Sequence, residues 1–213
     1  MQQQLQFDIG AAYDFFISIF VLTNPQIFGL RPSWAKGVRA RLPARQREVI
    51  ENAQSFLPVP LAWLTSLPHA QKDGSQALAA LRSVPAEERL SLLGLRADTP
   101  DLVRETLLNL SQRGSPKQAD LDLLREDLQR RQVQASNQAL QNMVAAWGHP
   151  AEFGETYLDA LQSYQQVFFN QEEERIKPAL EEGLRFAQKL AAELPRVELL
   201  ERLSRGVVLE DLY

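Results

Sequence analysis

Prolines stand directly ahead of several stretches whose apolar residues repeat at helical spacing, and this pattern constrains the fold more than any other. Proline is tolerated at the first position of a helix, because its missing N–H would have no acceptor within the helix there. In "DTPDLVRETLLNL" and "GSPKQADLDLLREDLQRR", Thr99 and Ser115 each precede a proline and are predicted N-caps. The same pattern recurs at Pro43, Pro85 and Pro195.

Two long amphipathic segments are predicted to form an antiparallel pair of helices. Apolar residues fall at helical spacing at Leu121, Leu124 and Leu128 and again at Leu140, Val144 and Trp147, so this segment is predicted to be one long helix. Residues 153–194 form a second such segment, which Pro178 is expected to bend or divide. Because the connection between the segments is short, we expect them to lie antiparallel. The predicted core includes Phe15, Phe16, Ile19, Trp63, Leu124, Leu128, Leu161 and Phe168.

Strand-like patterns are confined to the two ends of the chain. "LQFDI" at residues 5–9 alternates apolar and polar residues, and "GVVLEDLY" at residues 206–213 is rich in β-branched and apolar residues. We expect at most a short edge strand at each terminus. No solenoid-type repeat, low-complexity tract or Gly- and Ser-rich linker divides the chain. The expected fold is a single, mainly α, multi-helix domain spanning residues 1–213.

The composition argues against several kinds of function. The chain has no cysteine and 2 histidines, so disulfides, thiolate metal sites and a cysteine nucleophile are excluded. His69 and His149 each lie beside a proline, which is typical of helix boundaries rather than of ligands. The signatures G-x-S-x-G, H-E-x-x-H, G-x-G-x-x-G and the P-loop are all missing. We therefore expect neither an enzyme nor a bound cofactor or metal.

The termini and the charge bear on the compartment and on partners. The start "MQQQLQFDIG" lacks the basic residues and apolar core of a signal peptide, and no apolar run approaches the ~18 residues of a membrane span. The formal net charge is -4, whereas a domain that binds nucleic acid by itself usually has a basic balance or face. We expect a soluble, cytoplasmic protein with no membrane partner.

One face of the second long segment carries a candidate ligand site. In chain order this face presents Tyr157, Leu161, Tyr164, Phe168, Glu172 and Arg175. Glu172 and Arg175 are three residues apart and can pair, and a charge pair beside aromatic rings can form the floor of a small-molecule pocket. We expect Tyr13 or Trp34 to close that pocket. An aromatic stripe at helical spacing is also typical of ordinary core packing, and this alternative stays open.

A second candidate is the basic run "GLRPSWAKGVRARLPARQR", residues 29–47. It carries five arginines and one lysine with no acidic residue. Such a run can contact phosphate groups, or it can be the solvated face of a helix or meet an acidic partner surface. The residues predicted for a weak phosphate contact are Arg39, Arg41, Arg45 and Arg47.

Three segments together resemble a known family. They are "FDIGAAYDFFISIFVLTNPQIFGLRPSWAKGVRARLP", "YQQVFFNQEEERIKPALEEGLRFAQKLA" and "LLERLSRGV". In combination they are similar to the N-terminal region of bacterial transcriptional regulators related to the ArsR family. In such proteins a helical N-terminal region is followed by a winged helix-turn-helix that reads DNA. The short helix, recognition helix and wing of that element have no counterpart within residues 1–213.

The resemblance implies a regulatory domain that senses a small molecule or forms a homodimer. It also implies that DNA is bound only through the winged helix, which we expect to be absent from this chain. Metal sensing in the ArsR family relies on cysteine and histidine, so a chain without cysteine is not expected to sense metals. The alternative is a helical protein-interaction module without a small-molecule ligand.

Overall fold

The computed structural model describes residues 7–130 and 136–204, and every regular element in these ranges is helical. The α-helices are α1 (Ala11–Thr23), α2 (Pro32–Arg41), α3 (Ala44–Gln54), α4 (Leu61–Ser66), α5 (Gly74–Ser83), α6 (Ala86–Gly94), α7 (Asp101–Arg113), α8 (Gln118–Arg130), α9 (Asn137–Gly148), α10 (Pro150–Tyr164), α11 (Asn170–Glu193) and α12 (Arg196–Leu203). Two 3₁₀ helices, η1 (Pro25–Phe28) and η2 (His69–Gln71), and one π-helix, η3 (Gln165–Phe169), complete the set.

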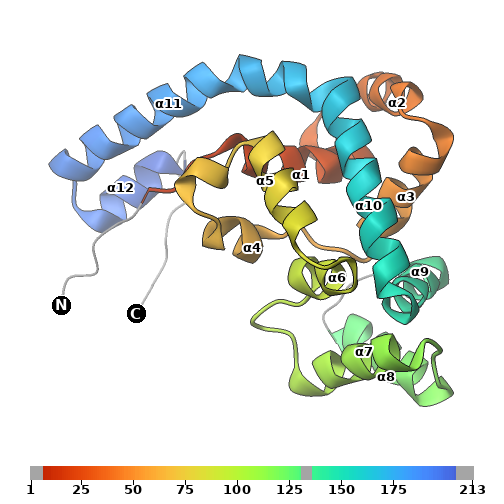
Figure 1. The fold of residues 1–213 in the computed structure, drawn as a ribbon. Helices are drawn as coiled ribbons and strands as arrows, with labels where there is room; N and C mark the ends of the chain where they lie inside the picture. Colours follow the sequence, from red (N-terminus) through yellow and green to blue (C-terminus); the bar gives the residue numbers. More distant parts are fainter. Residues whose placement is uncertain (1–6, 131–135, 205–213) are drawn as a thin grey trace.

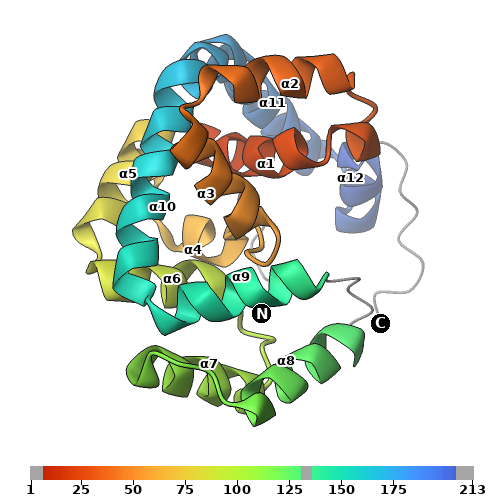
Figure 2. The same cartoon turned by 90° about the vertical axis from the view of Figure 1, so that its right-hand side faces the viewer.

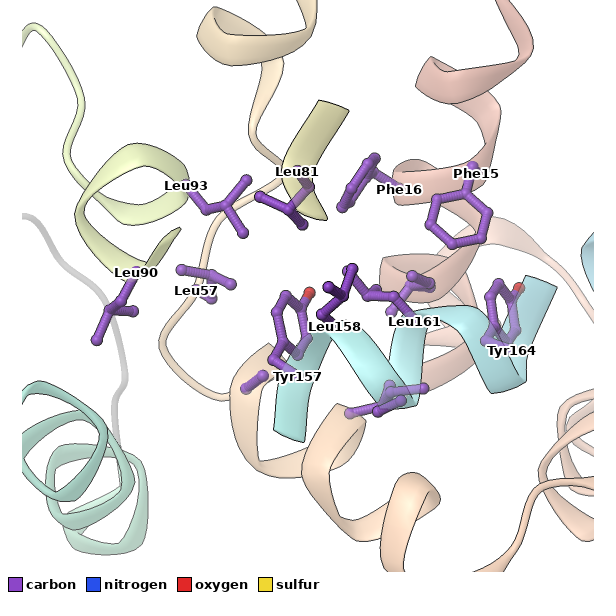
Figure 3. Packing of buried hydrophobic residues seen from close by; sticks show 14 of the residues in the cluster. Phe15, Phe16, Leu57, Leu81, Leu90, Leu93, Tyr157, Leu158, Leu161 and Tyr164 are labelled. Atoms are coloured by element: carbon purple, nitrogen blue, oxygen red, sulfur yellow. The ribbon is translucent and has the colours of Figure 1, made fainter. Parts of the chain in front are cut away.

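Helix α10 is the centre of the molecule. It packs against α6 and α3 and, more loosely, against α5 and α9 (Figure 1). Its buried face carries Tyr157, Leu158, Leu161 and Tyr164. Around that face lie rings and aliphatic side chains from α1, α5 and α6, including Phe15 of α1 (Figure 3). This arrangement confirms a mainly helical fold.

The remaining helices extend from the two ends of α10. Helices α7 and α8 lie at one end beside α9, whereas α1, α2 and the start of α11 lie at the other end (Figures 1 and 2). Helix α11 continues from α10 through η3 and leads to α12 (Figure 1). None of the helices in residues 7–130 and 136–204 is long and apolar enough to cross a membrane.

Helix α10 approaches α6 closely at Gly154. A Cβ atom built on Gly154 would lie 2.1 Å from the backbone oxygen of Ala86, so glycine is required there by the space available. The buried Arg89 side chain secures the same junction. Its Nη1 donates to the carbonyl of Gly154 at 3.2 Å, and its Nε donates to the carbonyl of Val84 at 2.9 Å. Arg89 thereby joins the end of α5 to α6 and α10.

The predicted core is largely confirmed. Phe15, Phe16, Ile19, Trp63, Leu124, Leu161 and Phe168 are all buried. Leu128 is only partly buried and packs against the edge of the core. Because the predicted residues come from α1, α4, α8, α10 and η3, one cluster joins segments that are far apart in the sequence.

The predicted helix starts need correction by one or two residues. Pro43, Pro85, Pro100 and Pro195 each occupy the position before the first helical residue rather than the first helical position itself. Thr99 is not an N-cap, because its hydroxyl accepts a hydrogen bond from the backbone N–H of Arg96 at 3.0 Å. Ser115 is not an N-cap either, since α8 begins only at Gln118 and the Asp120 carboxylate accepts from the N–H of Lys117 at 2.6 Å.

The predicted pair of long helices is not confirmed. The segment from Leu121 to Trp147 contains two helices, α8 and α9, and the hydroxyl of Ser136 caps α9 by accepting from the N–H of Ala139 at 3.1 Å. The segment 153–194 is helical up to Glu193 through α10, η3 and α11, and Pro178 lies within α11 without dividing it. Of the predicted edge strands, residues 7–9 are not in a strand, and residues 5–6 and 206–213 lie outside the described residues.

The contact at Gly154 gives a stability prediction. In the variant Gly154→Ala the added methyl group must displace the backbone of α6, so we expect the free energy of unfolding to fall by about 3 kcal/mol. The matched control is Gly183→Ala in α11, where no heavy atom of the described residues lies within 4 Å of the added Cβ. This change should raise the free energy of unfolding by about 0.5 to 1 kcal/mol, since alanine favours the helix. Urea denaturation followed by circular dichroism measures both, and an unchanged midpoint for Gly154→Ala would contradict the contact.

Candidate functional site

A hollow of about 260 Å³ lies between α1, α2 and the junction of η3 with α11. Its walls include Trp34 of α2, Phe168 of η3 and Glu172 of α11. Asp14 and Ser18 of α1 face it from the other side. Three residues predicted from the sequence to share a pocket, Trp34, Phe168 and Glu172, therefore do line one hollow.

The π-helix η3 forms one wall of the hollow. It presents two adjacent aromatic residues to the interior: Phe168 meets Trp34 with 5.8 Å between ring centroids, and Phe169 meets Phe15 with 5.0 Å. The buried side chain of Gln165 in the same turn has no hydrogen-bond partner for its amide nitrogen within the described part of the chain. π-helical turns are rare, less stable than α-helix and frequent at functional sites.

Ser18, which lines the hollow, takes part in two hydrogen bonds. The Tyr164 hydroxyl donates to Ser18 Oγ at 2.9 Å, and Ser18 Oγ donates to the carbonyl of Phe15 at 2.7 Å. Burial raises the pKa of Tyr164 because it disfavours the phenolate, so this hydroxyl keeps its proton. Tyr164 itself does not line the hollow, and it is linked to the hollow through Ser18.

The charge pair predicted from the sequence lies at the rim. Arg175 Nε donates to Glu172 Oε2 at 3.0 Å. The Arg175 side chain is 75% exposed and the Glu172 side chain is 30% exposed, so Glu172 borders the hollow while Arg175 points to solvent. Tyr13 and Tyr157 do not line this hollow. Tyr157 is buried and stacks on Phe153 with 5.3 Å between ring centroids.

The sequence reasoning did not identify the contribution of α1, chiefly Asp14, Ile17 and Ser18. A signal was present, since Asp14 is the one charged residue in the apolar segment "AAYDFFISIFVLT". Asp14 is half-buried, and burial raises the pKa of its carboxyl group. A charged residue on a predominantly apolar helix often marks a polar site.

The basic run forms α2 and the start of α3. Arg41 and Arg45 are exposed, and Arg39 lies 3.7 Å from the Glu51 carboxylate. The Nη1 atom of Arg41 donates to the carbonyl of Val167 in η3 at 3.5 Å. Part of the run therefore serves internal contacts, and one of those contacts is with the π-helix that forms the wall of the hollow.

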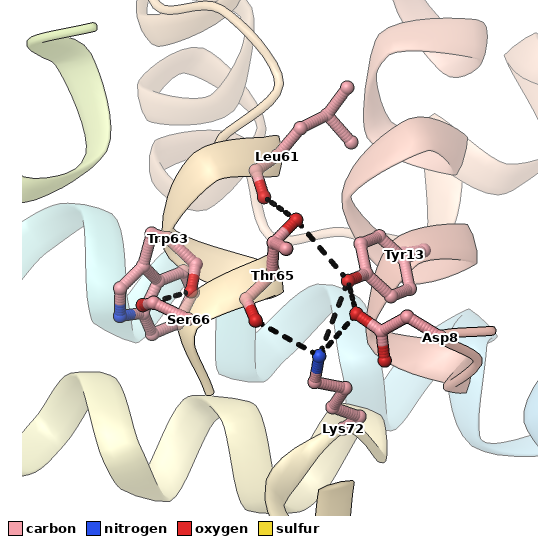
Figure 4. Close-up of polar contacts among 7 residues, drawn as sticks. All are labelled: Asp8, Tyr13, Leu61, Trp63, Thr65, Ser66 and Lys72. Carbon is pink, nitrogen blue, oxygen red and sulfur yellow. Dashed lines mark hydrogen bonds and ion pairs between the residues drawn. The ribbon is translucent and has the colours of Figure 1, made fainter. Parts of the chain in front are cut away.

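Tyr13 belongs to a different cluster, centred on the buried Lys72 (Figure 4). The ammonium group of Lys72 pairs with the Asp8 carboxylate and donates to the carbonyl of Thr65 at 3.2 Å and to the Tyr13 hydroxyl at 3.4 Å. The Tyr13 hydroxyl also donates to Asp8. The backbone carbonyl of Lys72 accepts from the N–H of Ala12 at 2.8 Å. This cluster anchors the chain ahead of α1, and its groups satisfy one another.

A second hollow of about 300 Å³ lies between the end of α3, α7, α8 and α9. Its walls are largely aliphatic, with Leu107, Leu124 and Met143 among them, and the buried carboxylate of Asp127 is also at its surface. No residue of the sequence-predicted site lies there. Within residues 7–130 and 136–204, no group of three or more His, Asp or Glu side chains is placed to hold a metal ion.

Comparison with protein-family models, with curated proteins and with solved structures finds no match to this chain.

The Asp8 and Lys72 pair predicts a specific dependence of stability on pH. Partial burial opposes the charged carboxylate, but hydrogen bonds from Lys72 and Tyr13 outweigh it, so the pKa of Asp8 is lowered from 3.8. A lowered pKa stabilises the fold above the ordinary value, and this stabilisation is lost as the pH falls through the lowered value. We expect Asp8→Asn to unfold more easily than the parent at pH 7, with the difference shrinking below about pH 3.8.

Chemical denaturation at a series of pH values measures this difference. The control is Asp122→Asn, which removes the same charge from an exposed pair with Arg125 on α8 and should change stability little at any pH. A pH-independent loss of stability in Asp8→Asn would show that the carboxylate charge is not what stabilises this cluster.

Proposed function

We propose that this chain is the regulatory domain of a transcriptional regulator and that a small-molecule effector binds in the hollow beside Trp34. The chain resembles the N-terminal region of ArsR-related regulators, and in this proposal DNA is read by a winged helix outside residues 1–213. The effector changes the position of α11 relative to α1 and α2. The working unit is a homodimer in the cytoplasm.

The observation that carries the proposal is the course of α11. Helix α11 spans 24 residues from Asn170 to Glu193, a length of about 36 Å, and ends at the turn before α12. Near its start, Glu172 and Ile176 line the hollow. A rigid helix transmits a displacement at one end to the other end. A ligand that separates Phe168 from Trp34 therefore also moves the far end of α11, beyond the body of the molecule (Figure 1).

The polar contacts around the hollow support the same function. Glu172, Ser18 and Asp14 offer polar groups from two helices, while Trp34 and Phe168 offer apolar surface. Ligand pockets commonly combine apolar walls with a few convergent polar groups. The arrangement offers no nucleophile activated by a neighbouring base among the residues that line the hollow, and this favours binding over catalysis.

A second candidate function is a helical interaction module without a ligand. Its support is the apolar surface next to the hollow: Ile27 is 75% exposed, and Phe28, Leu30 and Ile17 are also exposed. Contiguous apolar surface of this kind is typical of protein interfaces. In that case a second copy or another protein covers η1 and the outer face of α1.

Thermal denaturation in the presence of a metabolite library separates the two functions. An effector at 100 times its Kd should raise the free energy of unfolding by about 2.7 kcal/mol. The variant Trp34→Ala should remove this shift, because it removes one wall of the hollow. The matched control Phe186→Ala, an exposed aromatic residue in the far half of α11, should keep it. A stable dimer that responds to no compound would favour the interaction module.

The basic run gives a prediction about DNA. The net charge is -4, and part of the basic run is engaged within the molecule, with Arg39 close to Glu51 and Arg41 bonded to Val167. We expect at most weak binding of duplex DNA, lost near physiological salt because counterion release dominates such binding. Fluorescence anisotropy with labelled duplexes at two salt concentrations measures it.

Two double variants complete that measurement, one as the test of the basic run and one as its control. Replacing Arg45 and Arg47 by alanine should remove the residual binding at low salt. Replacing Arg125 and Arg130, which pair with acidic residues on α8, should have little effect for the same change in charge. Tight, salt-tolerant and sequence-dependent binding by residues 1–213 would contradict the assignment of this chain as a regulatory region.

A further inference from the structure

The ionisable side chains that line the Trp34 hollow are all acidic. Among the described residues that line it, the ionisable groups are the carboxyl groups of Asp14 and Glu172, and no lysine or arginine side chain takes part. The other walls are aliphatic or aromatic and include Ile17, Trp34 and Phe168. A carboxylate held against such walls loses part of its hydration and gains from a nearby positive charge.

The two carboxyl groups differ in their surroundings. Glu172 accepts hydrogen bonds from Arg175, so its charge is largely balanced at the rim. Asp14 is half-buried, and within residues 7–130 and 136–204 no cation lies within ion-pair distance of it. Burial raises the pKa of Asp14, and a hydrogen bond from its own backbone N–H offsets this in part. Asp14 is therefore the group whose charge a ligand would balance.

The aromatic walls also favour a positively charged ligand. Trp34 and Phe168 meet edge to face, with ring centroids 5.8 Å apart and planes at 73°. The face of an indole or phenyl ring carries negative potential and attracts ammonium groups. An anionic ligand would meet two carboxyl groups, and a neutral apolar ligand would leave Asp14 without a countercharge.

Building on the proposed function, we propose that the effector is an organic cation with an apolar body. Its ammonium group pairs with Asp14, and its body lies between Trp34, Phe168 and the aliphatic side chains of α1. The volume of about 260 Å³ is just below the range of about 300 to 1,000 Å³ usual for small-molecule pockets, which favours an amine with a single ring or a short alkyl chain.

Titration with three compounds that share one apolar body tests the ligand class. Phenylbutylamine is a cation at neutral pH, phenylbutanol is neutral and phenylbutyrate is an anion. Binding is followed by quenching of Trp34, isolated as the signal that is lost in Trp34→Phe while Trp63 and Trp147 remain. We expect the amine to bind at least about tenfold more tightly than the other two, since a charge-assisted hydrogen bond is stronger than a neutral one.

A matched pair of variants assigns the charge to Asp14. Asp14→Asn keeps the shape of the side chain and should weaken binding of the amine about tenfold, while binding of phenylbutanol stays within about twofold. Asp159→Asn removes the same charge from the exposed face of α10, outside the hollow, and should leave both affinities within about twofold. Circular dichroism of each variant confirms that the helices are intact.

The outcomes separate this inference from the proposed function. Equal or tighter binding of phenylbutanol or phenylbutyrate, or an unchanged affinity in Asp14→Asn, overturns the cation assignment and leaves the effector site standing. The cation assignment is also overturned by a second result. In that result neither phenylbutylamine nor a series of other alkyl and aryl ammonium ions binds, while a compound from the metabolite library stabilises the parent chain but not Trp34→Ala. If the library too gives no response that depends on Trp34, both proposals fail together.

Discussion

The close contact between α6 and α10 at Gly154 is the constraint on which the rest of the structure depends. It sets the position of α10, and Arg89 fixes it by donating to carbonyl groups at the end of α5 and on α10. A buried guanidinium group requires several acceptors, and the orientation of these three helices supplies them. Because α10 continues into η3 and α11, the direction in which α11 leaves the molecule follows from this junction.

The hollow beside Trp34 lies at the opposite end of α10 from that junction. Its walls are built by α1, α2 and η3, which are joined to α10 through Phe15, Tyr164 and Phe169 rather than through the Arg89 contacts. The region that carries the proposed site is thus connected to the rigid centre by aromatic packing.

Periodicity predicted a mainly helical fold and most of the core, because apolar spacing reflects burial along a single helix. It also placed Phe168 and Glu172 in one candidate site, and Trp34, one of the two residues expected to close that site, lines the same hollow. Periodicity could not place Asp14 in the hollow, since the position of Asp14 depends on how α1 packs against α11. It placed Tyr157 on the same stripe as Phe168, but the extra residue of the π-helix changes the register between α10 and α11.

The π-helix has a further geometric consequence. A π-turn amounts to one residue inserted into an α-helix, and each residue of an α-helix turns its successor by about 100°. The angular relation between the buried face of α10 and the acidic start of α11 is therefore set by the number of residues in η3, as well as by their chemistry. Deletion of a single residue between Gln165 and Phe169 would restore a continuous α-helix and rotate Glu172 away from α1. The length of this turn, which no hydrophobic pattern records, determines which side chains meet at the hollow.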